Sequence, residues 1–320
     1  MKIVVLERNS VGPDVSIDAF SPLGEVTAYP NTTGVEQVKE RIKDADIIVA
    51  NKSPLSEETL KDATNVKLIC ELATGFDNVD LEYTKSRNII VSNVVNYSTD
   101  SVAQHTFASL FYIMEKLNHY DNYVKGGEYA SQDRFSNFDI PFTELAGKTW
   151  GIIGMGNIGQ KVAKIATAFG CKVIFYSVTG KSKVTEYEQV SFETLLKESD
   201  VLSIHCPLSD LTRGLIDIKA LSQMKKTAYL INVARGPVVV DADLYKALSE
   251  DMIAGAALDV TGTEPMRDTN PLSKFMDSNK LLITPHLAWA SIEARVRCVD
   301  EVALNIKAFL EGHERNRVNN

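Results

Sequence analysis

The sequence contains few cysteines and no long apolar run. Its cysteines lie far apart, form no CxxC pair and accompany no histidine cluster with metal-ligand spacing, so neither a disulfide framework nor a metal site is expected. We interpret them as reduced thiols in a cytoplasmic protein. No apolar stretch reaches the roughly 18 residues of a membrane span, and the N-terminus leads directly into a strand-like segment, so neither membrane insertion nor export is expected. The four cysteines are Cys70, Cys171, Cys206 and Cys298.

An excess of positive charge is also missing. The chain has 34 basic and 42 acidic side chains, a formal charge of −8, so no overall positive field favours nucleic acid or an anionic membrane surface. A small molecule is the expected partner. With 320 residues and 44% hydrophobic side chains, the chain can bury a large core, and its length favours two domains.

Short β-branched runs alternate with helix-patterned segments, which is the pattern of βα units around a parallel sheet. The expected fold class is therefore α/β. In the first part of the chain, buried strands are expected at KIVVLE, ADIIVAN, VKLICE and NIIVSNV. Six further strand candidates follow, at TWGIIG, CKVIFYS, DVLSIHC, TAYLINV, MIAGAALDV and KLLITP. Six strands fit a dinucleotide-binding sheet.

Two long helices and an irregular stretch complete the pattern. The first helix is expected to begin near Ser98 and to end at Gly126-Gly127. The stretch EYASQDRFSNFDIPFTELAGK after it has no clear period, and its aromatic residues suggest that it packs against another surface, with a dimer contact as one hypothesis. The last helix, within residues 291–312, has apolar positions at helical spacing and must bury them on existing structure.

A GxGxxG pattern stands between a predicted strand and a predicted helix in WGIIGMGNIGQKVAKIATAFG, which is the context that a dinucleotide-binding turn requires. Gly154 would permit the tight turn, Gly156 the approach of the pyrophosphate and Gly159 the packing of the helix. The helix N-terminus would favour the negative charge. A glycine-rich turn without a ligand is the alternative, but the flanking strand and helix have the lengths of a binding unit.

The end of the second strand in such a fold usually carries an acid that accepts hydrogen bonds from the adenosine ribose. Ser177 holds that position here, and Lys181 and Lys183 follow it. A carboxylate would repel a 2′-phosphate, whereas a hydroxyl and two lysines would accept one, so the sequence favours NADP(H). The alternative is that the lysines are ordinary solvated loop residues and that NAD(H) binds through other contacts.

Three polar groups follow later strands, in the order Arg235, Glu264 and His286, where ligands bind in open α/β sheets. An imidazolium can give a proton to a keto group as hydride arrives, and a carboxylate behind the ring fixes its tautomer. A guanidinium can hold a substrate carboxylate. Each residue alone has a structural explanation, but together and in this order they form a complete set for 2-keto acid reduction. The other histidines, including His105 and His205, are attributed to packing or solvation.

With these motifs the sequence resembles the D-isomer-specific 2-hydroxyacid dehydrogenases over essentially its whole length. The motifs that carry the resemblance are GIIGMGNIG, NVARGPVVVD, DVTGTEP and TPHLAWAS. The resemblance implies that Arg235, Glu264 and His286 are the catalytic triad. The segments 50–52, 101–106 and 288–290 are most similar to glycerate dehydrogenases, also called hydroxypyruvate reductases, which implies reduction of hydroxypyruvate or glyoxylate to a D-2-hydroxy acid such as D-glycerate.

The resemblance also implies the remaining contacts. The substrate carboxylate would bind N–H groups near Thr74 and Gly75 in ATGFDNVD, with Asn51 as a further substrate contact, and Asp259 would bind the nicotinamide carboxamide. Ser177 is the departure from the family pattern that puts an NAD preference in doubt. Further cofactor contacts are implied at Asn157, Ile158, Cys206, Pro207 and Val233.

The family further implies a Rossmann-type doubly wound parallel sheet in a dinucleotide-binding domain, residues 100–287. A smaller flavodoxin-like α/β substrate domain would comprise residues 1–99 and 288–320, and the protein would be a homodimer. Two other functions remain as alternatives. One is reduction of a bulkier keto acid such as phenylpyruvate, and the other is a dinucleotide-sensing binding protein on the same scaffold, against which the complete triad argues.

Overall fold

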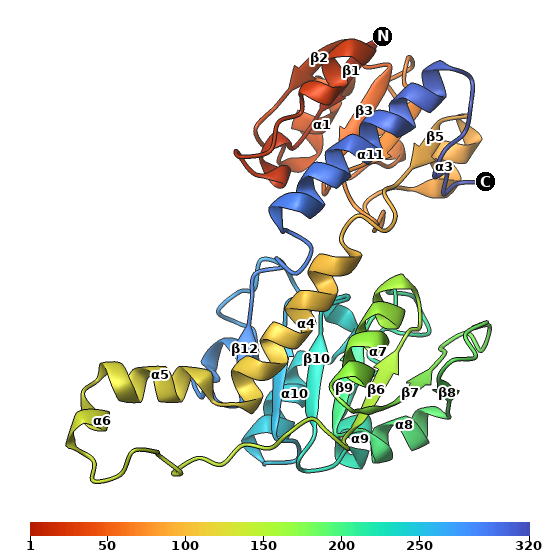
Figure 1. Ribbon diagram of the computed structural model, residues 1–320. Coiled ribbons are helices and arrows are strands. Elements are labelled where there is room, and N and C mark those ends of the chain that lie inside the picture. The colour runs from red at the N-terminus through yellow and green to blue at the C-terminus, as the bar shows by residue number, and fades with distance from the viewer. The chain divides into compact units, whose positions relative to one another are not determined.

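The computed structural model describes all 320 residues, and the chain divides into two compact units. Unit 1 comprises Met1–Ser98 and Trp289–Asn320, and unit 2 comprises Thr99–Ala288. The borders expected from the sequence lie one residue from each of these. Figure 1 shows the blue C-terminal helix of unit 1 beside the red and orange strands from the N-terminal part of the chain.

Unit 1 contains a five-stranded sheet in which every neighbouring pair is parallel, with the order β2-β1-β3-β4-β5. This is the flavodoxin-like order, as expected. The strands are β1 (Lys2–Val5), β2 (Glu25–Ala28), β3 (Ile47–Ala50), β4 (Leu68–Glu71) and β5 (Ile90–Ser92). The helices are η1 (Arg8–Val11), η2 (Asp18–Leu23), α1 (Gly34–Ile42), α2 (Glu57–Leu60), α3 (Leu81–Ser86) and α11 (Ile292–Leu310).

Helix α11 completes this unit because its apolar stripe packs on the sheet. Ala294, Cys298 and Val302 are fully buried in one cluster with side chains of β1, β3 and β4. Strand β2 was not predicted from the sequence. It is an edge strand whose residues are almost all exposed, so it lacks the apolar run that marks the buried strands.

Unit 2 contains a seven-stranded parallel sheet with the order β12-β11-β10-β9-β6-β7-β8. The order reverses between β6 and β9, as in a Rossmann-type doubly wound sheet. The strands are β6 (Thr149–Ile153), β7 (Lys172–Tyr176), β8 (Glu188–Gln189), β9 (Val201–Ile204), β10 (Tyr229–Asn232), β11 (Gly255–Leu258) and β12 (Leu281–Ile283). The six predicted strands are present, and the two-residue, exposed β8 is the one that the sequence did not indicate.

The helices of unit 2 cover the sheet except for two that leave it. Both α5 and α6 extend away from the sheet in Figure 1, and neither has a buried residue. The helices are α4 (Thr99–Met114), α5 (Leu117–Lys125), α6 (Glu128–Ser131), α7 (Asn157–Ala168), α8 (Phe192–Glu198), α9 (Ile218–Gln223), α10 (Asp241–Ser249), η3 (Gly236–Val238) and η4 (Pro271–Lys274).

The expectation of a single long helix over residues 98–125 was wrong, because the helix breaks at Lys116. That residue has φ 57°, in the left-handed region that a helix cannot continue through. Its ammonium group donates to the Asn279 carbonyl at 2.9 Å and lies 5.7 Å from the centre of the Tyr229 ring. These tertiary contacts hold the break in place, and α5 departs from the sheet after it.

The stretch after α5 is irregular and leaves its phenylalanine side chains exposed until Leu145, which is buried in the core of unit 2. Between α6 and β6 it has no helix or strand, and the exposed fractions of Phe135, Phe138 and Phe142 are 90%, 71% and 58%. The expected packing of these aromatic side chains is therefore not made within the chain. No helix in the structure has both the length and the apolar composition that crossing a bilayer requires.

Candidate active site

All candidate groups of unit 2 lie at one edge of its sheet. The loops that follow β6, β7, β9, β10, β11 and β12 leave the carboxyl ends of parallel strands, and the strand order reverses between β6 and β9. Open α/β sheets bind ligands at this edge, outside the point of reversal.

The glycine turn after β6 has the geometry of a phosphate cradle. Gly154 has φ 92°, and a Cβ there would meet the backbone of Cys206 at 2.8 Å, so only glycine fits this turn. A Cβ at Gly156 would meet no protein atom within 4 Å. Gly156 is also the N-terminal cap of α7 and has no side chain to accept from the first-turn N–H groups, which are the groups that bind phosphate. At Gly159 a Cβ would collide with the Gly154 carbonyl.

Ser177 follows the last residue of β7 and is half-buried. Lys181 and Lys183 lie in the loop after it, both exposed and neither in an ion pair. The end of β7 therefore carries a hydroxyl followed by two exposed lysines, with no carboxylate before Glu186. This surface can accept a phosphate group without electrostatic repulsion.

Two residues shape the turn that presents Arg235 after β10. The amide of buried Asn232 donates to the Arg235 carbonyl at 3.0 Å and accepts from the Ala234 N–H at 3.1 Å. The Arg235 guanidinium donates to the Ala234 carbonyl at 2.8 Å. A Cβ on Gly236 would collide with the Thr261 carbonyl, so this glycine lets the turn after β10 contact the turn after β11.

The turn after β11 carries Glu264 and has its own internal ties. Thr261 Oγ1 donates to the Thr263 carbonyl at 3.0 Å. Asp241 Oδ2, at the start of α10, accepts from the Gly262 N–H at 3.0 Å and from the Asn270 amide at 2.6 Å. The Glu264 carboxylate is therefore presented by a hydrogen-bonded turn at the edge of the sheet.

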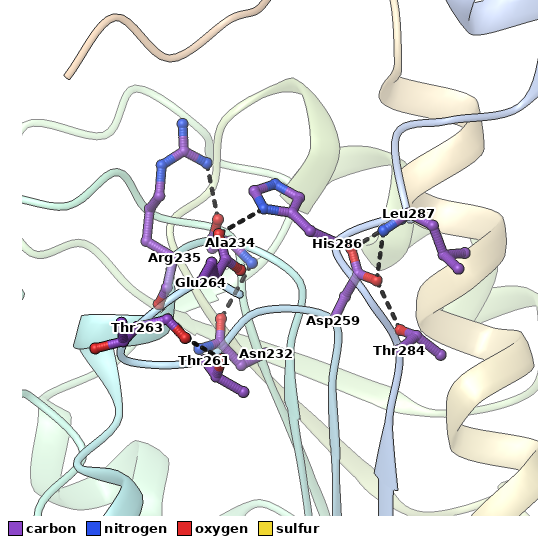
Figure 2. A network of polar contacts seen from close by, with 11 residues as sticks. Asn232, Ala234, Arg235, Asp259, Thr261, Thr263, Glu264, Thr284, His286 and Leu287 are labelled. Atoms are coloured by element: carbon purple, nitrogen blue, oxygen red, sulfur yellow. Dashed lines mark hydrogen bonds and ion pairs between the residues drawn. The ribbon is translucent and has the colours of Figure 1, made fainter. Parts of the chain in front are cut away.

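His286 and Glu264 form a pair. The distance between His286 Nδ1 and Glu264 Oε2 is 2.8 Å, and the two side chains are 28% and 35% exposed. Figure 2 shows the His286 ring and the Arg235 guanidinium above the same strand ends, with the Glu264 carboxylate against the ring. Because the Glu264 carboxylate accepts a hydrogen bond from the Nδ1–H group of His286, Nε2 is the ring nitrogen that can hold a transferable proton.

Asp259, implied as a cofactor contact, has a structural role that the sequence did not indicate. Its carboxylate is 2% exposed and accepts three hydrogen bonds from the loop that carries His286. The donors are the Thr284 hydroxyl at 2.6 Å and the N–H groups of Leu287 and Ala288, both at 2.8 Å. The only sequence signal was the position of Thr284 at the start of TPH, directly after a strand.

At the end of β9, His205 is half-buried and Cys206 is buried, and both side chains are neutral. Burial raises the pKa of the Cys206 thiol to about 11 and lowers that of the His205 ring to about 3. His205 Nε2 lies 3.0 Å from Ser203 Oγ, which accepts from the Trp150 indole N–H at 2.8 Å. The Cys206 thiol therefore lines the site and does not act as a nucleophile. Pro207, whose carbonyl accepts from Thr212, and the half-buried Val233 also follow strands at this edge.

In unit 1 the expected substrate loop follows β4. Thr74 Oγ1 donates to the Val94 carbonyl at 2.7 Å, and the Asn93 amide donates to the Thr74 carbonyl at 2.8 Å. The N–H groups of Thr74 and Gly75 donate to no acceptor within the chain. Asn51, 9% exposed, follows β3 and gives its N–H to Glu7 Oε2 at 3.0 Å. The Thr74 carbonyl is thus held by a hydrogen bond, and the N–H groups of Thr74 and Gly75 are available to bind a carboxylate.

Comparison with known proteins shows the family to which the chain belongs. Residues 107–288 match the family described as D-isomer specific 2-hydroxyacid dehydrogenase, NAD binding domain. The chain belongs to the D-isomer-specific 2-hydroxyacid dehydrogenase family. It is 38% identical over 325 residues to the hydroxypyruvate reductase of Blautia hydrogenotrophica, covering 100% of both chains. It is also 38% identical over 317 residues to the glycerate dehydrogenase of Methylorubrum extorquens, covering 99% of this chain and 98% of the relative.

A solved structure of an acyclic imino acid reductase in complex with NADPH and D-Arg is similar to this D-2-hydroxyacid dehydrogenase. The TM-score is 0.89 and the identity 32%, over 99% of this chain and 100% of that chain. The protein is accordingly an oxidoreductase, an NAD(P)-dependent 2-hydroxyacid dehydrogenase, and the alternative of a binding protein without activity is set aside.

Proposed function

We propose that this dehydrogenase reduces hydroxypyruvate or glyoxylate to the corresponding D-2-hydroxy acid. The observation that carries the proposal is the 2.8 Å pair of His286 and Glu264 beside Arg235, at the edge of a dinucleotide-binding sheet. The names of two full-length relatives at 38% identity, a hydroxypyruvate reductase and a glycerate dehydrogenase, support the substrate.

The three side chains have different roles in this proposal. His286 donates the Nε2 proton to the keto oxygen, while Glu264 stabilises the imidazolium through Nδ1. Arg235 binds the substrate carboxylate and polarises the keto group, for which its fixed charge and planar donors suit it. The bound dinucleotide supplies the hydride. The N–H groups of Thr74 and Gly75 in unit 1 are proposed to bind a substrate carboxylate, and Asn51 is proposed as a further substrate contact.

The dinucleotide is proposed to be held by unit 2, and unit 1 is proposed to be the substrate domain. The turn at Gly154, Gly156 and Gly159 would hold the pyrophosphate at the N-terminus of α7. Asp259 keeps acceptor capacity at Oδ2, which accepts one protein N–H, and would take the nicotinamide carboxamide. The other proposed contacts are Asn157, Ile158, Cys206, Pro207 and Val233.

We propose NADP(H) as the preferred cofactor. Ser177 and the exposed Lys181 and Lys183 support this because they leave the end of β7 without a carboxylate. A relative with 32% identity has been solved with NADPH. NAD(H) remains the alternative, since the matching family is described as NAD binding.

One kinetic screen tests substrate and cofactor together. NADPH and NADH would each be combined with hydroxypyruvate, glyoxylate, pyruvate and phenylpyruvate, and oxidation of the reduced nicotinamide would be followed. We expect the largest kcat/KM with hydroxypyruvate or glyoxylate and NADPH, and a D product by chiral chromatography. A larger kcat/KM with phenylpyruvate would support a bulkier keto acid, and preference for NADH would refute the cofactor proposal.

A homodimer is also proposed. The arm formed by residues 117–144 leaves the sheet of unit 2 and exposes Phe135, Phe138 and Phe142. Apolar side chains gathered on one projecting segment mark a protein contact. A second copy of the chain is the proposed occupant, because the arm belongs to this chain and would reach another molecule of it symmetrically.

A cytoplasmic location is proposed on the basis of the cysteines. All four are buried and unpaired, which is typical of proteins from a reducing compartment. Cell fractionation that recovers the protein with the cytosol would support this, and recovery outside the cytosol would refute it.

A further inference from the structure

The loop that carries His286 has an unusual backbone conformation. His286 has φ 54°, in the left-handed region that non-glycine residues seldom adopt, so surrounding contacts must hold it there. Its N–H donates to the Asp259 carbonyl at 2.8 Å. The next two N–H groups, of Leu287 and Ala288, donate to Oδ1 and Oδ2 of the Asp259 carboxylate. Asp259 therefore fixes the backbone conformation of the loop from which the His286 ring reaches Glu264.

Thr284 connects Asp259 to the end of β12. Its hydroxyl donates to Asp259 Oδ1 at 2.6 Å, which is a charge-assisted and therefore strong hydrogen bond. Its N–H donates to the Leu258 carbonyl at 2.8 Å, which aligns β12 with β11. The Thr284 hydroxyl proton is therefore already used in the hydrogen bond to Asp259.

His105, on α4, supplies the next link. Its Nε2 lies 3.0 Å from Thr284 Oγ1 and 3.7 Å from Asp259 Oδ1. A hydroxyl has one proton, and Thr284 gives it to a carboxylate that has none to return, so His105 Nε2 must be the donor in its bond with Thr284. Burial lowers the pKa of the His105 ring, opposed by the charge of Asp259, so the ring is neutral near pH 7 with its single proton on Nε2.

We propose that His105 is a positioning residue for the reaction. Its Nε2–H directs the Thr284 hydroxyl toward Asp259, and Asp259 then holds the loop that aims His286 at Glu264. His105 acts through these two residues and not on the reacting atoms. The inference deepens the proposed function, because it rests on His286 as the proton donor.

Paired variants separate the hydrogen bond from packing. Thr284→Val removes the hydroxyl with little change of volume, and Thr284→Ser retains it. His105→Phe removes the ring donor, and His105→Gln can restore an N–H near the position of Nε2. The matched control is Thr106→Val, because Thr106 is fully buried in the same helix but its hydroxyl donates only to the Val102 carbonyl.

We expect Thr284→Val and His105→Phe to lower kcat about tenfold, as loss of one hydrogen bond allows. Affinity for the reduced dinucleotide, measured by fluorescence, should change less than about threefold. The pH at which kcat falls on the alkaline side should shift downward, because a His286 ring misaligned against Glu264 is stabilised less as an imidazolium. Thr284→Ser, His105→Gln and Thr106→Val should stay within about threefold of the wild type. Wild-type kcat and an unshifted pH profile in both Thr284→Val and His105→Phe would overturn the proposal.

The tautomer of His105 offers a test that needs no variant. Nitrogen NMR of the labelled wild-type protein should show a neutral ring protonated at Nε2 near pH 7. A neutral ring protonated at Nδ1 would lack the Nε2–H donor and would contradict the proposed chain of hydrogen bonds.

A double-variant cycle distinguishes failure of this inference from failure of the proposed function. If His286→Gln has near-normal turnover, the proposed role of His286 fails. If His286→Gln is impaired, His105→Phe should add less than about twofold in that background, because both act on one step. If the two fold-losses in kcat multiply fully in the double variant, the positioning role of His105 is refuted and the proposed function is unaffected.

Discussion

At the residue scale, the proposed chemistry of His286 depends on which of its two ring nitrogens is hydrogen-bonded to Glu264. Glu264 occupies Nδ1 of His286 at 2.8 Å, which assigns proton donation to Nε2. The His286 side chain retains 28% exposure, so the ring can meet a small substrate. In the proposed mechanism Arg235, presented by the neighbouring turn, would supply the positive charge that binds a keto acid.

Replacing His286 by Gln should remove the proton donor while preserving a polar side chain of similar reach. We expect kcat to fall by roughly 10²- to 10⁴-fold, the usual contribution of general acid catalysis. Binding of the reduced dinucleotide should be nearly unchanged in a fluorescence titration. His313→Gln, at an exposed histidine of unit 1, is the control, and turnover of His286→Gln close to that control would disprove the assignment.

Replacing Ser177 by Asp should reverse the proposed cofactor preference. A carboxylate at the end of β7 would repel a 2′-phosphate and accept hydrogen bonds from ribose hydroxyls. We expect kcat/KM with NADPH to fall about tenfold or more and kcat/KM with NADH to hold or rise. Thr179→Asp, two residues farther into the loop, controls for added charge. An unchanged ratio of the two cofactors in Ser177→Asp would count against contact at this position.

At the scale of elements, the site exists because loops from different strands meet at one sheet edge. The turn after β10 and the turn after β11 touch at Gly236, where the Thr261 carbonyl occupies the place of a side chain. The β12 loop is tied to β11 through the Asp259 carboxylate. Each proposed catalytic group therefore depends on the packing of a neighbouring loop as well as on its own strand.

Gly236→Ala tests the contact between the two turns. The added methyl group must displace the Thr261 backbone, which is overpacking of a kind that costs about 1–3 kcal/mol. We expect a lower melting temperature and, because the displaced turn carries Glu264, a larger loss in kcat than in dinucleotide affinity. A variant with wild-type kcat and melting temperature would show that the turns are not in close contact.

The strand ends of unit 1 contain a different feature, a buried acid. Glu71, at the end of β4, is fully buried, and only Oε1 has a hydrogen bond, from the Asn78 amide at 3.1 Å. Burial, reinforced by the charge of Glu7, raises the pKa of Glu71 to about 8, against 4.5 as the ordinary value. The folded state therefore retains a proton that the unfolded state releases near pH 4.5.

This proton makes stability depend on pH in a defined direction. Between about pH 4.5 and pH 8 the unfolded state binds fewer protons, so the unfolding free energy contributed by Glu71 falls as pH rises, by at most about 1.4 kcal/mol per pH unit. Below this window both states are protonated, and above it both are ionised. Glu71→Gln should abolish the slope and gain stability relative to the parent as pH rises.

The two tryptophans allow the measurement to be confined to unit 1. Trp289 belongs to unit 1 and Trp150 to unit 2, so a Trp150→Phe background leaves Trp289 as the single reporter during urea unfolding. Glu82→Gln, at an exposed acid of the same unit, is the matched control. A stability difference between Glu71→Gln and its parent that stays constant from about pH 5 to about pH 8 would refute the buried neutral acid.

At the scale of the whole molecule, each unit encloses its own sheet and core. The arm of residues 117–144 has no such core, since neither α5 nor α6 has a buried residue. Its three exposed phenylalanines need another surface to remove them from water. A dimer would satisfy that need.

Light scattering on a size-exclusion column tests the dimer. The wild type should elute with twice the 35.3 kDa mass of the chain, and Phe138→Ser combined with Phe142→Ser should elute as a folded monomer. Met276→Ser, which changes another highly exposed apolar side chain outside the arm, should leave the dimer intact. A monomeric wild type, or a double variant that remains dimeric, would exclude the arm as the contact.

The sequence alone determined the parts whose physical cause is local. Buried strands such as β6 and β9 are continuous apolar runs, and a glycine turn between a strand and a helix predicts a dinucleotide site without further context. The order of Arg235, Glu264 and His286 after strands was likewise readable, because carboxyl ends of parallel strands share one edge. The exposed edge strands β2 and β8 were missed because pairing, and not an apolar pattern, defines them.

Tertiary structure alone decided the features that depend on partners distant in the sequence. The helix break at Lys116 follows from contacts with Asn279 and Tyr229, which no periodicity can reveal. The chain from His105 through Thr284 to Asp259 joins residues up to 179 positions apart, and its hydrogen bonds exist only after α4 packs on the sheet. Local propensity and pattern specify elements, whereas the direction of a side chain and its partner depend on the completed packing.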